Sequence, residues 1–212
     1  MFKVKPLEKV LQTHPDFKPN WKNDLYGGLE NPKFGKLTHI VVCKEDGTPI
    51  FDQYMIEEKP GAVIVPYDKH KGTIRVGMIT EERFIPGKRY VALPRGFGKD
   101  NESELEAAYR ELFEETGLSN GNLEDKAILV LGRNNPNTAF YKTDFPIVAA
   151  KFSRLEEIMN PKGDKFVEKI QKVRPYSFSE IRELEKTGQL ECGITKAALF
   201  EFGCYMPEFY KG

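Results

Sequence analysis

The sequence predicts an α/β or α+β sandwich, and two observations support this class. Strand-like segments come first, a helical segment interrupts them, and further strands and then helices follow, which is the order expected when sheets pack against helices. Hydrophobic residues make up 40% of the 212 residues, so the chain has enough apolar material for a core of moderate size.

The strands are predicted from β-branched or alternating apolar residues that end at turn signals. Asp46-Gly47 is such a signal, and it joins the first two segments into a hairpin. The polar stretch Asp68–Gly72 is predicted as another turn. The predicted strands are 37–43, 50–56, 62–66, 73–79, 90–93, 127–131 and 145–152.

Three helices are predicted from apolar periodicity and capping residues. Between Glu102 and Gly117 the apolar positions recur at helical spacing, with the glycine placed to end the helix. Ser177-Phe178-Ser179-Glu180 resembles a capping box that opens a helix to about Lys186. A last helix is expected from Thr195 to Gly203. The apolar positions of the first helix are Leu105, Ala108 or Tyr109, and Leu112.

The predicted domain organisation has two parts. Residues 1–36 are rich in Pro, Lys, Asn and Gly and show poor periodicity, so we expect an N-terminal arm or small subdomain of irregular structure there. Residues 37–212 form the main domain.

Composition limits the binding partners and the cellular location that we expect for the protein. The 32 basic and 32 acidic side chains give a formal net charge of +0, so bulk charge indicates neither a nucleic-acid nor a membrane partner. The three cysteines have no CxxC spacing that would indicate zinc or a disulfide framework. With no signal-peptide pattern at Met1–Lys5 and no apolar run of membrane-spanning length, we expect a cytoplasmic protein.

The predicted helix that ends at Gly117 concentrates carboxylates near its C-terminus. Glu111 and Glu115 are i, i+4 neighbours, and Glu114 is three residues from Glu111, so all three lie within an arc of about 100°. Like charges at this spacing repel, and the helix dipole disfavours anions at this end. The arrangement indicates a compensating cation, and Mg²⁺ with its preference for oxygen ligands fits best.

The complete spacing resembles the Nudix box. Gly96 is followed after five residues by Glu102, and after seven more by Arg110-Glu111; Glu114-Glu115 and Gly117-Leu118 complete the pattern. The resemblance implies a Nudix fold, with a mixed β-sheet between helices. It also implies that Glu111, Glu114, Glu115 and the Gly96 carbonyl bind Mg²⁺, for which Mn²⁺ could substitute. Glu102 and Arg110 would support the loop as an ion pair.

Residues outside the box are most similar to the ADP-ribose pyrophosphatase group of this superfamily. The likeness is carried by Ile79–Phe84 and Leu93-Pro94-Arg95-Gly96, although Ala92 and Arg95 stand where that group has glutamate and alanine. Arg83 matches an arginine of that group. Because Arg83 and Arg95 flank the predicted site and arginine suits bidentate phosphate recognition, we expect both to contact the substrate. Together with Glu111 and Glu115, a loop glutamate would be catalytic; Glu168 matches best, with Asp164 and Glu157 as alternatives.

The resemblance implies hydrolysis of a nucleoside diphosphate linked to another group, with ADP-ribose or an ADP-sugar, cleaved to AMP and a sugar phosphate, as the first expectation. Other Nudix substrates stay open at this point: dinucleoside polyphosphates, damaged nucleoside triphosphates and RNA caps. A nucleotide-sensing module without turnover is a further alternative. By analogy with the same group, a homodimer that uses residues 1–60 is expected.

Overall fold

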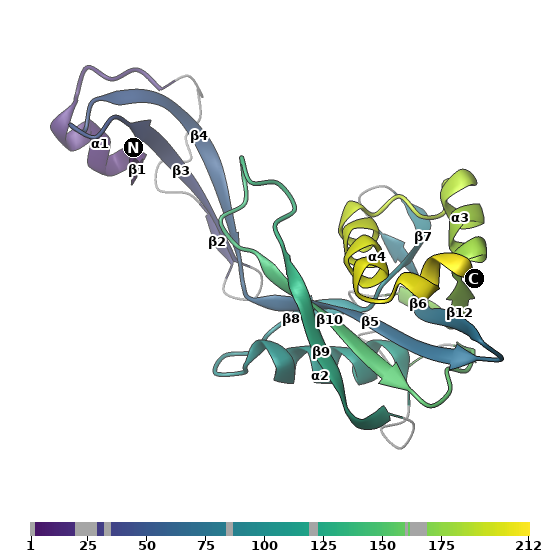
Figure 1. Cartoon of the computed structure of the whole chain (residues 1–212). Coiled ribbons are helices and arrows are strands. Elements are labelled where there is room, and N and C mark those ends of the chain that lie inside the picture. Colours follow the sequence, from purple (N-terminus) through teal and green to yellow (C-terminus); the bar gives the residue numbers. More distant parts are fainter. Residues whose placement is uncertain are drawn as a thin grey trace. The chain divides into compact units, whose positions relative to one another are not determined.

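A computed structural model describes residues 3–19, 29–31, 35–83, 87–118, 123–159, 161 and 169–212. The chain divides into two compact units (Figure 1). One comprises Met1–Lys59 and Asn135–Asp144, and the other comprises Pro60–Asn134 and Phe145–Gly212.

The first unit contains a sheet built around strand β3 (Gly35–Cys43). Strand β3 pairs antiparallel with β1 (Lys3–Pro6), β2 (Leu29–Asn31) and β4 (Pro49–Glu58). Helix α1 (Leu7–Thr13) packs its buried apolar residues against those of β3. The predicted hairpin of β3 and β4 is present, and Gly47 adopts a left-handed φ of 94° in its turn.

The compact units do not coincide with the predicted division after residue 36. Because β3 pairs with β4 as well as with β1 and β2, residues 35–58 belong to the same unit as the N-terminal segment. Residues 1–36 also contain regular structure, in β1, α1 and β2, where we expected an irregular arm. These elements are short, and α1 has no side-chain cap, so they leave little periodic signal in the sequence.

The second unit contains an eight-stranded sheet. Six of its strands lie in the order β11-β12-β6-β5-β10-β9, and the remaining two, β7 and β8, pair with β6 and β5. Strands β5 and β10 run parallel and the other pairs are antiparallel, so the sheet is mixed. The strands are β5 (Gly61–His70), β6 (Thr73–Arg83), β7 (Lys88–Ala92), β8 (Arg95–Phe97), β9 (Leu123–Asn134), β10 (Phe145–Phe152), β11 (Ile158–Met159) and β12 (Lys169–Ser177).

Helices cover both faces of this sheet (Figure 1), which confirms the predicted fold class. On β5, Val63 and Val65 join the core beneath three helices, and the alternate residues Ala62 and Ile64 pack with a fourth helix on the opposite face. The alternation of side chains along one strand thus builds two cores. The helices of the first core are α3 (Phe178–Lys186), α4 (Gly193–Tyr205) and the 3₁₀-helix η2 (Pro207–Lys211), and the fourth helix is α2 (Glu104–Thr116).

The capping signals read from the sequence are present. Ser177 and Glu180 form the predicted capping box of α3. Gly117 ends α2 in the left-handed region with a φ of 64°. A second capping box, at the start of α2, joins Ser103 and Glu106. None of the helices in the described parts of the chain has the length and hydropathy that crossing a bilayer requires.

The predicted turn at Asp68–Gly72 begins too early. Strand β5 continues to His70, and the chain reverses at Lys71 and Gly72, which both have positive φ. Asp68 is only 1% exposed, and it accepts hydrogen bonds from Arg75 Nε (3.0 Å) and from the main-chain N–H of Leu155 (2.8 Å). This carboxylate therefore ties the β5–β6 hairpin to the segment that follows β10.

We expect Asp68→Asn to lower the free energy of unfolding by about 1–3 kcal/mol, because it weakens bonds to a charged acceptor that is shielded from water. Urea denaturation measures this difference. Glu156→Gln is the control, since Glu156 and Arg154 form an exposed pair at 3.5 Å, and it should cost less than about 1 kcal/mol. Equal effects of the two substitutions would contradict the structural role of Asp68.

Candidate active site

Arg110 is the centre of a hydrogen-bond network between α2 and the preceding loop. Its Nε and Nη2 donate to the two carboxylate oxygens of Glu102, each at 2.9 Å, which is the bidentate geometry of strong ion pairs. Nη2 also donates to the Phe97 carbonyl at 2.8 Å. Nη1 donates to Glu111 Oε1 at 2.6 Å and to Glu114 Oε2 at 2.9 Å. The expected pair of Glu102 and Arg110 is thus part of a larger assembly.

Glu111 reaches from α2 to the main chain of Gly96 in β8. A Cβ atom at position 96 would lie 2.1 Å from Glu111 Cδ and 2.4 Å from either carboxylate oxygen, so the absence of a side chain leaves room for this carboxylate. Gly61 of β5 approaches the same residue, because a Cβ there would lie 2.4 Å from the Gly96 carbonyl oxygen. Two glycines therefore allow β5, β8 and the carboxylate of α2 to lie close together.

Glu115 lies one turn further along α2 and is 1% exposed. Its Oε2 accepts a hydrogen bond of 2.8 Å from the main-chain N–H of Arg95. The predicted apolar face is confirmed at Ala108 and Leu112, which are buried, and wrong at Leu105, which is exposed. Glu111 and Glu115 share the buried face of the helix. Burial of two carboxylates is costly unless donors or cations compensate it, so α2 presents a polar site to the sheet.

Burial and charge shift the pKa values of these groups in opposite directions. Burial raises the pKa of Glu111, and the bond from Arg110 only partly offsets this effect. The bonds from Arg110 and from the main-chain N–H of Lys99 lower the pKa of Glu102 to about 2. Arg110 has its pKa raised, chiefly by the bond to Glu102. Glu102 and Arg110 are therefore both charged at neutral pH.

The oxygen donors do not converge on a single point in this conformation. Within the described ranges, no three His, Cys, Asp or Glu side chains are arranged as a metal site. Arg110 Nη1 lies between Glu111 and Glu114 and donates to both carboxylates. The donor set nevertheless has the chemistry that Mg²⁺ prefers, with carboxylates on successive turns beside a glycine main chain. The Glu114 side chain is 52% exposed and has space to change its rotamer.

Arg95 has an unpredicted partner in Cys192. Its Nη1 donates to Cys192 Sγ at 3.1 Å, and its Nη2 lies 3.8 Å from Oε1 of the buried Glu81. Burial raises the pKa of the Cys192 thiol, but the charge of Arg95 and hydrogen bonds with Thr195 outweigh burial and leave the pKa lowered. No sequence motif connects positions 95 and 192, so only the fold reveals this contact.

Several predicted residues lie elsewhere or outside the described part. Arg83 is the last residue of β6, where its main chain pairs with β7. Glu168 and its alternative Asp164 lie outside the described residues. The other alternative, Glu157, pairs with Lys172 at 2.7 Å. The roles predicted for these residues in catalysis and substrate contact stay predictions.

Comparison with known proteins gives the family. The NUDIX domain family matches residues 57–191, which is more than half of the chain. This protein belongs to the Nudix family. It is therefore a Nudix hydrolase, and enzymes of this family generally use divalent metal ions and act on small nucleotide substrates.

A solved structure supports the Nudix fold. The structure described as "Crystal structure of ADP compounds hydrolase" matches with a TM-score of 0.58 and 13% sequence identity, over 85% of this chain and 90% of that one. At this identity the likeness concerns the fold alone. A search of curated proteins gave no match.

The pH dependence of stability tests the network around Arg110. The pKa of Glu102 lies below its ordinary value of 4.5 in the folded state, so its bonds stabilise the Nudix domain fully above that pH. This contribution is lost as the pH falls from 4.5 through about 2. We expect Glu102→Gln to be less stable than wild type in urea denaturation at pH 6, with the difference shrinking toward pH 2. A difference that does not change with pH would contradict the ion pair.

Proposed function

We propose that this Nudix hydrolase cleaves ADP-ribose or a related ADP-sugar to AMP and a sugar phosphate, with Mg²⁺ as its metal and Mn²⁺ as a substitute. The observation that carries the proposal is the pair of buried carboxylates, Glu111 and Glu115, beside the main chain of Gly96 and Arg95. The fold that this chain shares with a hydrolase of ADP compounds supports the choice of substrate class.

The metal ligands in this proposal are Glu111, Glu114, Glu115 and the main-chain carbonyl of Gly96. All are hard oxygen donors, and the space that Gly96 leaves beside Glu111 fits their use at a common site. When bound, the metal would neutralise the diphosphate and lower the pKa of a bound water. Because Arg110 Nη1 holds one oxygen of Glu111 and one oxygen of Glu114 in the described conformation, we expect metal binding to displace these two bonds.

The residues of the chain prepare the site for hydrolysis of the phosphoanhydride. In the reaction, water adds to one phosphorus, the bond from that phosphorus to the bridging oxygen breaks, and two phosphate monoesters are released. Glu102 fixes the guanidinium of Arg110, and Arg110 in turn fixes the start of the site by its bond to the Phe97 carbonyl. The Arg95 N–H directs one oxygen of Glu115.

The cellular setting stays a prediction. We propose a cytoplasmic location and a homodimer that includes residues 1–60, and a light-scattering mass equal to that of one chain would contradict the dimer. The sequence predicts that the main domain begins at residue 37, whereas the second compact unit begins at Pro60. Limited proteolysis of the purified protein tests this boundary.

Product analysis tests the proposed activity. We expect ADP-ribose and ADP-sugars to yield AMP in the presence of Mg²⁺, measured by chromatography beside dinucleoside polyphosphates, oxidised nucleoside triphosphates and capped RNA. Turnover of one of these other compounds in place of ADP-ribose would contradict the proposed substrate.

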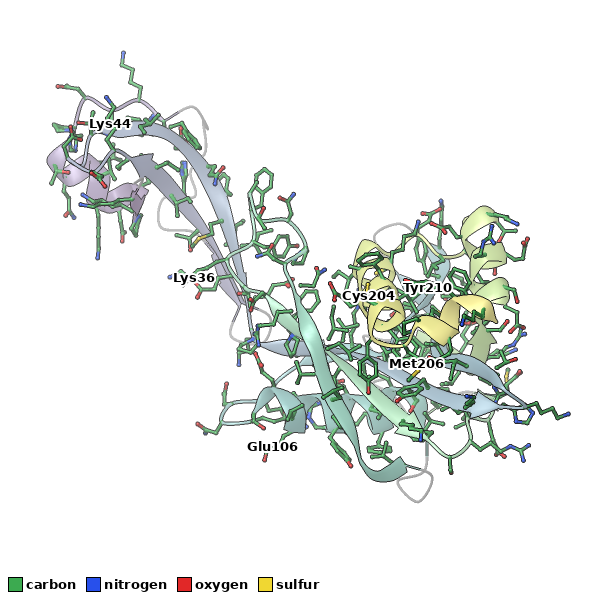
Figure 2. The ribbon with its side chains drawn as sticks, viewed as in Figure 1. Lys36, Lys44, Glu106, Cys204, Met206 and Tyr210 are labelled. Carbon is green, nitrogen blue, oxygen red and sulfur yellow. The ribbon has the colours of Figure 1, made fainter. Side chains whose placement is uncertain are left out.

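Glu115→Gln should reduce the turnover number at least about 100-fold, because stabilisation of transition-state charge by a metal is worth several kcal/mol. The control is Glu106→Gln on the same helix, since glutamine also serves in a capping box and Glu106 is exposed (Figure 2). Equal activity of the two variants would contradict the metal site.

A further inference from the structure

We propose that Cys192 and Arg95 form a positioning pair that holds Glu115 in the orientation needed for metal binding. The inference rests on the proposed function, because it assigns a task within the same site.

The first step of the argument is the main chain of residue 95. Its N–H donates to Glu115 Oε2 at 2.8 Å, and Glu115 is almost completely buried. The orientation of a buried carboxylate is set by the donors around it, so the position of this N–H affects the direction of the carboxylate's other lone pairs. The pairing of Arg95 with Val63 of β5 restrains this main chain from one side.

The second step is the side chain of the same residue. The Arg95 guanidinium is 24% exposed and lies between Cys192 Sγ, at 3.1 Å from Nη1, and Glu81 Oε1, at 3.8 Å from Nη2. A guanidinium is a rigid planar fork, so acceptors at its two ends restrain both its position and its direction. Arg95 thus contacts Glu115 through its main chain, and through its side chain it contacts the residue that precedes α4.

The third step is the start of α4, which contacts this segment twice. Cys192 immediately precedes α4, and Thr195 in its first turn is fully buried. The hydroxyl of Thr195 accepts a hydrogen bond of 3.2 Å from the main-chain N–H of Leu93. The first turn of α4 therefore anchors residues 93–95, and through them it sets the donor that orients Glu115.

This assignment differs from the predicted contact between Arg95 and the substrate diphosphate. An arginine that binds substrate contributes to the Michaelis constant, whereas a positioning residue affects metal binding before any nucleotide is present. The two roles are therefore separable by a measurement made without substrate.

The test is the affinity for Mn²⁺ without nucleotide, measured by isothermal titration calorimetry on the full chain. We expect Cys192→Ala to bind Mn²⁺ about 10–100-fold more weakly, the usual effect of losing a residue that orients a metal ligand. Cys192→Ser keeps an acceptor for Arg95 and should recover most of the affinity. Cys204→Ala is the matched control, because Cys204 is an exposed residue of α4 (Figure 2), and it should bind as wild type does.

Arg95→Met tests the pair from the other side and keeps the proposal falsifiable if Cys192→Ala fails to fold. It should lose Mn²⁺ affinity to a similar extent, and adding Cys192→Ala should cause little further loss. Wild-type affinity in either variant would overturn the proposal. Arg95→Met with unchanged Mn²⁺ affinity and a raised Michaelis constant for ADP-ribose would assign the residue to substrate binding instead.

The outcomes separate this inference from the proposed function. A wild-type protein that binds Mn²⁺ but leaves ADP-ribose intact contradicts the proposed substrate, while the comparison of the variants still decides the positioning pair. A wild-type protein that binds no Mn²⁺ overturns both proposals.

Discussion

The site depends on the guanidinium of Arg110, whose positive charge offsets the negative charges of three carboxylates. Arg110 joins Glu102 in the loop to Glu111 and Glu114 on the helix, and it also contacts the Phe97 carbonyl. Without this cation, clustered carboxylates near the C-terminal end of α2 would repel one another and oppose the helix dipole. Arg110 therefore lets the chain concentrate negative charge beside the sheet before any metal arrives.

The same charge arrangement connects folding with the proposed activity. Glu111 and Glu115 occupy the buried face of α2, a position that the core would otherwise fill with apolar side chains. Because Gly61 and Gly96 have no side chains, strands β5 and β8 and the Glu111 carboxylate can lie close together. The metal would take over part of the compensation now provided by Arg110, so the binding of the metal and the rearrangement of the glutamates are one equilibrium.

Local sequence patterns predicted much of the secondary structure, whereas contacts between distant parts of the chain could not be predicted from the sequence. The spacing up to Gly117 predicted α2 and its left-handed end, because both follow from contacts within a few turns. Hydrophobic periodicity placed Ala108 and Leu112 correctly in the core, but it failed at Leu105, which is exposed, and it gave no sign that Glu111 and Glu115 share the buried face. The bond between Arg95 and Cys192 joins distant parts of the chain, so no local pattern indicated it. In the first unit, strands as short as β1 and β2 carried too little periodicity to be recognised.

The most direct test of the account is anomalous diffraction from crystals of the protein soaked with Mn²⁺. The account predicts an anomalous peak bounded by carboxylate oxygens of Glu111, Glu114 and Glu115 and by the main-chain carbonyl of Gly96, with Glu111 and Glu114 displaced from Nη1 of Arg110. A fully occupied peak elsewhere, or none at this site in crystals that keep all the bonds of Arg110, would contradict it.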